Sequence, residues 1–156
     1  MIALVAAALA QPHTYARDTG DVGVGVSLGG GAFPALDVSV YAAEHVALDF
    51  AIGPRWGFGD DLYLNVAGVV GLVGDFGTRR AHAGPFVRLG STLPGAFTES
   101  FVAGGVDARW LLGSEGRHVI ALDVGPGWFF VRDLPSVHHQ TSFLLYVKVG
   151  WSVYFG

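Results

Sequence analysis

The chain has 156 residues, of which 51% are hydrophobic and only 14% are charged, whereas an ordinary soluble domain is roughly 25% charged. Its net charge of −4 at pH 7 gives no cationic surface for nucleic acid, and the lack of cysteine excludes disulfides, thiolate metal sites and cysteine nucleophiles. The 24 glycines argue against a helical protein, because an interior glycine costs a helix about 1 kcal/mol relative to alanine. The mean hydropathy is +0.47, yet no apolar run reaches the ~18 residues of a membrane-spanning helix.

The first ten residues are typical of an export signal. A short apolar run from Ile2 to Leu9 ends in Ala8-Leu9-Ala10, an A-x-A cleavage pattern, before Gln11. No basic residue precedes the run, so either the natural start lies upstream of Met1 or the signal is truncated. We predict a signal peptide over residues 1–10, a polar leader over 11–20 and one folded domain over 21–156. The alternative is an apolar N-terminus that is not a signal.

From residue 21 onward, large apolar residues alternate with small or polar ones in a period of two, which indicates β-strands with two different faces. In the first segment, Val22, Val24 and Val26 share one face and Gly23 and Gly25 share the other. Most segments are close to the ~9–11 residues that cross a bilayer at a tilt, and no helix fits between them. The eight predicted strands comprise residues 21–28, 36–42, 46–53, 62–72, 83–89, 102–112, 120–130 and 143–155.

The contents of the two faces decide which of them points inward. An eight-stranded barrel encloses a space just wide enough for side chains, so the many Val, Leu, Ile, Phe and Trp residues would not fit there, while small residues and paired charges would. We therefore predict an all-β, eight-stranded antiparallel up-and-down transmembrane β-barrel with an apolar outer surface, whose closure leaves no unpaired edge. The charges predicted to form a network in the lumen are Asp37, Asp49, Arg88, Asp107, Arg109, Asp123 and Lys148.

These charges are expected to pair, because an unpaired buried charge costs several kcal/mol. We expect Asp107, Asp123 and Asp49 to pair with Arg109, Arg88 and Lys148, with the individual partners left open. An alternative is that the charges line a narrow ion path.

Aromatic residues on the outward face fall near the strand ends, as the two interfacial girdles of a membrane barrel do. With the first strand starting in the periplasm, the girdle residues at the outer rim are Trp56, Trp128, Phe130 and Phe143, and those at the inner rim are Trp110, Trp151 and Phe155. The outer loops are then residues 29–34, 54–61, 90–100 and 132–141, and the inner turns are residues 43–45, 74–81 and 113–117.

In strand count, pattern and length, residues 21–156 resemble the small eight-stranded outer-membrane barrels of Gram-negative bacteria, of the OmpX and OmpA-barrel type. The last strand, residues 149–155, is similar to the assembly signal of that family, although Gly156 follows the terminal Phe155. The resemblance implies an outer-membrane location, contact with lipid and lipopolysaccharide, and assembly by the outer-membrane insertion machinery. We expect a monomer without cofactor or metal.

Two polar sets in the loops suggest other chemistry. His138 and His139 could bind a metal, but without an H-x-x-x-H or cysteine partner they are more typical of a surface loop. His139, Ser142 and Glu99 resemble the His-Ser-Glu set of outer-membrane lipid A deacylases, although their spacing departs from the His-x-Ser motif of that family. The prediction is a structural or surface role in the envelope without catalysis. The alternatives are a lipid A-modifying enzyme, a narrow pore and a soluble lipocalin-like barrel.

Overall fold

The structure, a computed structural model, describes residues 17–58, 62–78, 80–93, 97–113, 115–133 and 139–156. The predicted signal peptide and residues 11–16 of the predicted leader lie outside this description, as do some side chains at strand ends, including those of Trp56 and His139. In the part of the chain described, no helix is long and apolar enough to cross a membrane.

The described chain is built from antiparallel β-strands that follow one another without an intervening helix. Their length reflects the alternation of β-branched and aromatic residues with small ones, which suits a pleated sheet with two different faces. The strands are β1 (Val22–Gly29), β2 (Ala35–Ala43), β3 (Val46–Phe58), β4 (Leu62–Gly74), β5 (Phe76–Gly77), β6 (Ala81–Thr92), β7 (Phe97–Leu112), β8 (His118–Asp133) and β9 (His139–Phe155).

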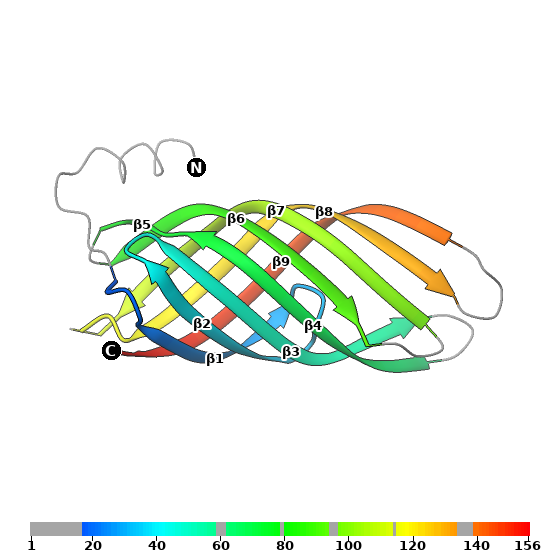
Figure 1. The fold of residues 1–156 in the computed structure, drawn as a ribbon, viewed down its shortest axis with the longest axis horizontal. Coiled ribbons are helices and arrows are strands. Elements are labelled where there is room, and N and C mark those ends of the chain that lie inside the picture. Colours follow the sequence, from blue (N-terminus) through cyan, green and yellow to red (C-terminus); the bar gives the residue numbers. More distant parts are fainter. Residues whose placement is uncertain (1–16, 59–61, 79, 94–96, 114, 134–138) are drawn as a thin grey trace.

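The strands close into a barrel (Figure 1). Each long strand pairs with its sequence neighbours, β1 pairs with β9, and β4 pairs with β6, so the eight long strands form one continuous ring. The two-residue β5 pairs with the start of β6 beside this ring. The predicted all-β, eight-stranded antiparallel up-and-down barrel is confirmed.

The barrel has two ends, which we call the proximal end, where Val22 and Phe155 lie, and the distal end (Figure 1). The strands run further toward the distal end than predicted. Within the segments expected as loops at residues 54–61, 90–100 and 132–141, the described residues 54–58, 90–92, 97–100, 132–133 and 139–141 are strand. The prediction was wrong because Pro54 and the glycines interrupt the alternation, whereas pairing with β4 carries β3 through Pro54 and Gly57 as far as Phe58.

The two faces of the wall differ sharply in exposure. Large apolar side chains on all eight long strands point outward, with Leu36 64% and Leu145 70% exposed. The side chains on the opposite face of each strand point into the lumen, where Asp107 and Asp123 are 0% and 1% exposed. The structure therefore has the predicted arrangement, with apolar residues outside and charges inside.

Candidate functional site

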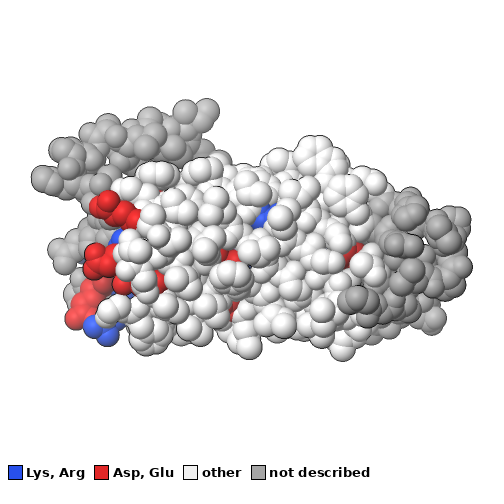
Figure 2. All heavy atoms as spheres, viewed as in Figure 1, with Lys and Arg blue, Asp and Glu red and all other residues white. Residues whose placement is uncertain are grey.

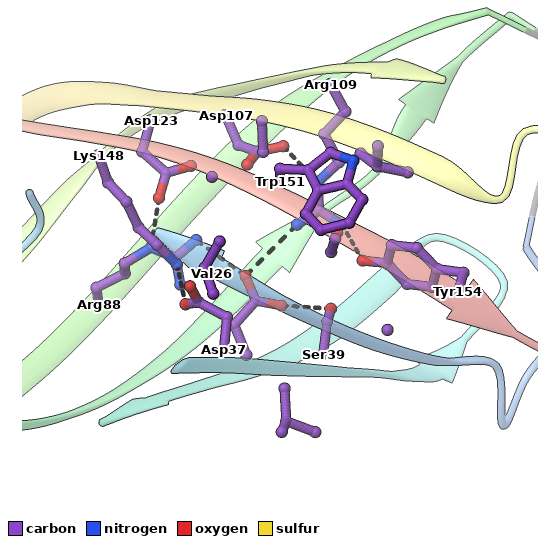
Figure 3. Close-up of a pocket in the computed structure, with 17 residues that line it drawn as sticks. Val26, Asp37, Ser39, Arg88, Asp107, Arg109, Asp123, Lys148, Trp151 and Tyr154 are labelled. Atoms are coloured by element: carbon purple, nitrogen blue, oxygen red, sulfur yellow. Dashed lines mark hydrogen bonds and ion pairs between the residues drawn. The ribbon is translucent and has the colours of Figure 1, made fainter. Parts of the chain in front are cut away.

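The centre of the lumen holds two arginines and three aspartates in direct contact (Figure 3). Arg109 Nε donates to Asp107 Oδ1 at 2.7 Å, and Arg88 Nε donates to Asp123 Oδ2 at 2.6 Å. Both guanidinium groups also contact Asp49 Oδ2, at 2.9 Å from Arg88 and 3.5 Å from Arg109. These five residues come from β3, β6, β7 and β8, so the cluster ties opposite walls of the barrel together.

A small residue on β4 makes room for one of these long side chains. A Cβ atom at Gly71 would lie 2.7 Å from Nη1 of Arg88, which is its partner across the β4–β6 pair. Glycine at this position lets the guanidinium of Arg88 lie along the inner wall and reach Asp49 on β3.

Lys148 on β9 pairs with Asp37 on β2, with Nζ 2.6 Å from Oδ1. This partner differs from the expectation that Lys148 pairs with Asp49, Asp107 or Asp123. The strand between them, β1, carries only small residues on its inner face, namely Gly23, Gly25, Ser27 and Gly29, and Lys148 can therefore reach across it. A cavity of about 40 Å³ lies among these charges, which is room for only a few water molecules.

A second polar cluster fills the proximal part of the lumen. Arg109 Nη1 donates to the hydroxyl oxygens of Tyr41 at 3.1 Å and Tyr154 at 3.2 Å, and the Tyr41 hydroxyl donates to Asp75. Nδ1 of His82 lies 2.8 Å from the other carboxylate oxygen of Asp75. Burial acts to raise the pKa of Asp75, but the hydrogen bond from His82 and the charge of Arg109 outweigh it and lower that pKa.

Sequence reasoning missed this cluster because Asp75 falls in a turn. The turn expected over residues 74–81 gives no sign in the sequence that one of its residues points into the lumen. In the structure Asp75 is 2% exposed.

Arg17, in the segment predicted as a polar leader, closes the proximal mouth. Its guanidinium carbon lies 3.9 Å from the ring centroid of Tyr154, and its Nη2 donates to the carbonyl oxygen of Gly116 at 2.6 Å. The side chain is 6% exposed, so this residue belongs to the folded barrel.

The distal part of the lumen is filled by aromatic rings. Phe101 stacks on Phe129 at 5.3 Å between ring centroids and lies 5.8 Å from Tyr146, which in turn lies 5.6 Å from Phe86. The expectation that small residues and charges fill the interior was therefore incomplete. The alternation along the strands places these aromatic residues on the inner face. The sequence does not show, however, that the lumen is wide enough for their rings.

Beyond the rings, Arg55 and Glu99 form a two-pronged ion pair, with Nε and Nη2 3.0 and 2.7 Å from the two carboxylate oxygens. Glu99 belongs to the set compared with the deacylases, and this ion pair occupies its carboxylate. Ser142 is exposed on β9. The side chain of His139 and the whole of His138 lie outside the described residues.

The outward aromatic residues lie toward the two rims. Trp128 and Phe143 face each other across the β8–β9 pair near the distal end, and Phe130 follows on β8. Trp110, Trp151 and Phe155 lie toward the proximal end, and all six side chains are between 45% and 62% exposed. The side chain of Trp56 is not among those described.

The Trp128–Phe143 pair allows a direct test of the outer surface. Its rings meet edge to face, with centroids 4.8 Å apart and planes at 65°. A double-mutant cycle with Trp128→Ala and Phe143→Ala in the refolded barrel is expected to show a coupling free energy of about 0.5–1.5 kcal/mol. A matched cycle with Trp128→Ala and Phe155→Ala, whose sites lie near opposite ends, should be additive within about 0.5 kcal/mol. Equal coupling in both cycles would contradict the pairing.

In the described part of the barrel, ion pairs and aromatic rings thus occupy the proximal, central and distal parts of the lumen. Among the described residues, no group of three or more His, Asp or Glu side chains is placed to hold a metal ion. The chain was compared with models of protein families, with curated proteins and with solved structures, and none of these matched it.

Proposed function

We propose that this protein is an integral β-barrel of the outer membrane of a Gram-negative envelope, with a structural or surface role and no catalysis. The observation that carries the proposal is the exposure of large apolar side chains on all eight long strands, while the central charges Asp49, Arg88, Asp107, Arg109 and Asp123 are buried. A soluble monomer rarely exposes a contiguous apolar patch larger than a few hundred Å².

The distribution of charge supports the same proposal. In Figure 2 the face in view is almost free of charged atoms along the wall, and carboxylates gather at the proximal end. Exposed charged residues at that end include Asp18, Glu44, Arg80, Glu115 and Arg117. A wall with few charges, next to a charged end, suits a hydrocarbon layer, in which an unpaired charge is costly.

The filled lumen supports a closed barrel in preference to a pore. The ion pairs of Arg88 and Arg109 span the centre, and the rings of Phe101, Phe129 and Tyr146 fill the distal part. Single-channel recordings of the refolded barrel in a planar bilayer are expected to show no steady conductance, and a steady conductance would favour the narrow pore instead.

The first experiment is fractionation of cells that express the full chain, followed by electrophoresis in SDS with and without boiling. We expect the protein in the outer-membrane fraction with two mobilities, because folded barrels of the family it resembles resist SDS until heated. Protein that stays soluble without detergent and shows a single mobility would contradict the membrane proposal and favour the lipocalin-like alternative.

The absence of catalysis is tested on the lipid of the same cells. We expect lipid A of unchanged composition when the protein is expressed. Loss of an acyl chain on expression, abolished by Ser142→Ala, would instead support the deacylase-like alternative.

A further inference from the structure

The central charges of the lumen are arranged as an incomplete ring. Going around it, Asp107 contacts Arg109, Arg109 contacts Asp49, Asp49 contacts Arg88, and Arg88 contacts Asp123. Each of these four links joins a carboxylate to a guanidinium. The remaining link, between Asp123 and Asp107, joins two carboxylates.

The two carboxylates at this link stand directly opposite each other. Asp107 on β7 and Asp123 on β8 are register partners on the same face of the wall, where side chains of an antiparallel pair have Cβ atoms about 4.5–5.5 Å apart. Figure 3 shows them side by side. Oδ2 of Asp107 and Oδ1 of Asp123 are both buried and accept no hydrogen bond from any described residue.

Each cation that the structure describes near the link already binds another group. Lys148 is the register partner of Asp123 on β9, but its Nζ binds Asp37 on β2. Arg88 and Arg109 are already engaged with the outer oxygens of the pair and with Asp49. The ring thus holds three carboxylates and two guanidinium groups, which leaves one negative charge in excess.

The other described groups near the ring are engaged elsewhere. Arg17 donates to the carbonyl oxygen of Gly116 and lies over the ring of Tyr154, and the Tyr146 hydroxyl donates to the carbonyl oxygen of Gly30. On the proximal side, the hydroxyls of Tyr41 and Tyr154 accept from Arg109, and His82 contacts Asp75. On β2, Ser39 donates to the second oxygen of Asp49 at 2.5 Å.

We propose that Asp107 and Asp123 share one proton at neutral pH and so form a proton-binding site at the centre of the barrel. One residue is a carboxylic acid whose O–H donates to the carboxylate of the other, so the two buried oxygens without a described partner satisfy each other. The proton closes the ring of hydrogen bonds and cancels its excess charge. Two carboxylates that share a buried site do not both ionise readily. The inference does not depend on the membrane location.

The site makes a prediction about proton linkage. A proton held by the folded state and released on unfolding makes stability fall as pH rises, by about tenfold in the folding equilibrium constant per pH unit. This fall in stability begins above about pH 4, where an ordinary aspartate of the unfolded chain loses its proton. It ends at the pH at which the folded barrel itself releases the shared proton. In Asp123→Asn the side-chain amide replaces the shared O–H as a permanent hydrogen-bond donor. The pH dependence of stability that comes from the shared proton therefore disappears.

The experiment compares wild type with Asp123→Asn and Asp107→Asn, each refolded as the full chain in detergent micelles. Infrared spectra at pH 7, with ¹³C-labelled aspartate, are expected to show the C=O band of one protonated carboxyl group in wild type and none in either variant. Urea unfolding between pH 6 and pH 8 should show the extra tenfold change per pH unit in wild type and in neither of these two variants. Asp18→Asn is the control, because Asp18 is exposed at the proximal end and does not belong to the ring, and it should keep both signals.

Three results would overturn the proposal. The first is a wild-type barrel without the protonated-carboxyl band at pH 7, a measurement that needs no variant to fold. The second is an equal pH dependence of unfolding in wild type and Asp123→Asn. The third is stabilisation of wild type, but not of Asp123→Asn, by sodium over choline at equal ionic strength, which would assign the site to a small cation instead of a proton.

Discussion

Replacing Arg109 with methionine is expected to lower the free energy of unfolding of the barrel by about 3–5 kcal/mol. This side chain contacts Asp107, Asp49, Tyr41 and Tyr154 and is 4% exposed. Methionine fills much of the volume of arginine but leaves Asp107 without its cationic partner. The decrease in the free energy of unfolding is large because a buried charge is then left uncompensated. Urea titration of the refolded barrel measures the change.

A second arginine provides the control for this result. Arg117 pairs with Glu115 at 2.7 Å, but the two side chains are 61% and 67% exposed at the proximal end. Arg117→Met should therefore cost less than about 1 kcal/mol. If the two variants unfolded at the same urea concentration, the lumen ion pairs would not hold the barrel together as we describe.

Replacing Val147 with arginine is expected to cost about 2–4 kcal/mol, because a cation on the lipid face near the middle of the bilayer is strongly disfavoured. Val147 lies at the centre of β9 and is 41% exposed. In a soluble barrel, the same substitution at an exposed position would be within about 0.5 kcal/mol of neutral. Unfolding of the protein refolded into lipid vesicles distinguishes the two environments.

Leu112 is the matched control for the lipid test. It is 44% exposed, nearly the same as Val147, but it is the last residue of β7, at the proximal end. Leu112→Arg should cost only about 0–1 kcal/mol, since the penalty falls toward the interface. A similar small cost at both positions would show that no hydrocarbon layer surrounds the middle of the barrel.

Part of the candidate site follows from the sequence alone. The seven predicted lumen charges all lie on the inner parity of their strands, because side chains of a strand alternate strictly between its two faces. Their partners do not follow in the same way. Arg88 on β6 meets Asp49 on β3 across the lumen, and such a contact depends on the tilt and stagger of strands that are not neighbours.

Two other features were beyond the sequence for a similar reason. The interior rings of Phe101 and Phe129 stack only because β7 and β8 place them opposite each other. Asp75 enters the lumen because β4 ends at Gly74 and the chain turns before β5 begins at Phe76. The alternation of residues along the strands shows neither that the lumen has room for the rings nor the direction in which that turn points.

The sequence by itself determined the number of strands and which residues face outward, since a one-residue shift would move every side chain of a strand to the other face. It also determined that the inner face carries more acids than bases. Only the tertiary structure decided that Asp107 and Asp123 form the one carboxylate–carboxylate link of the ring. The closed barrel brings seven charged side chains from six strands into one small space, and the lengths of the side chains and the stagger of the strands select which charges meet.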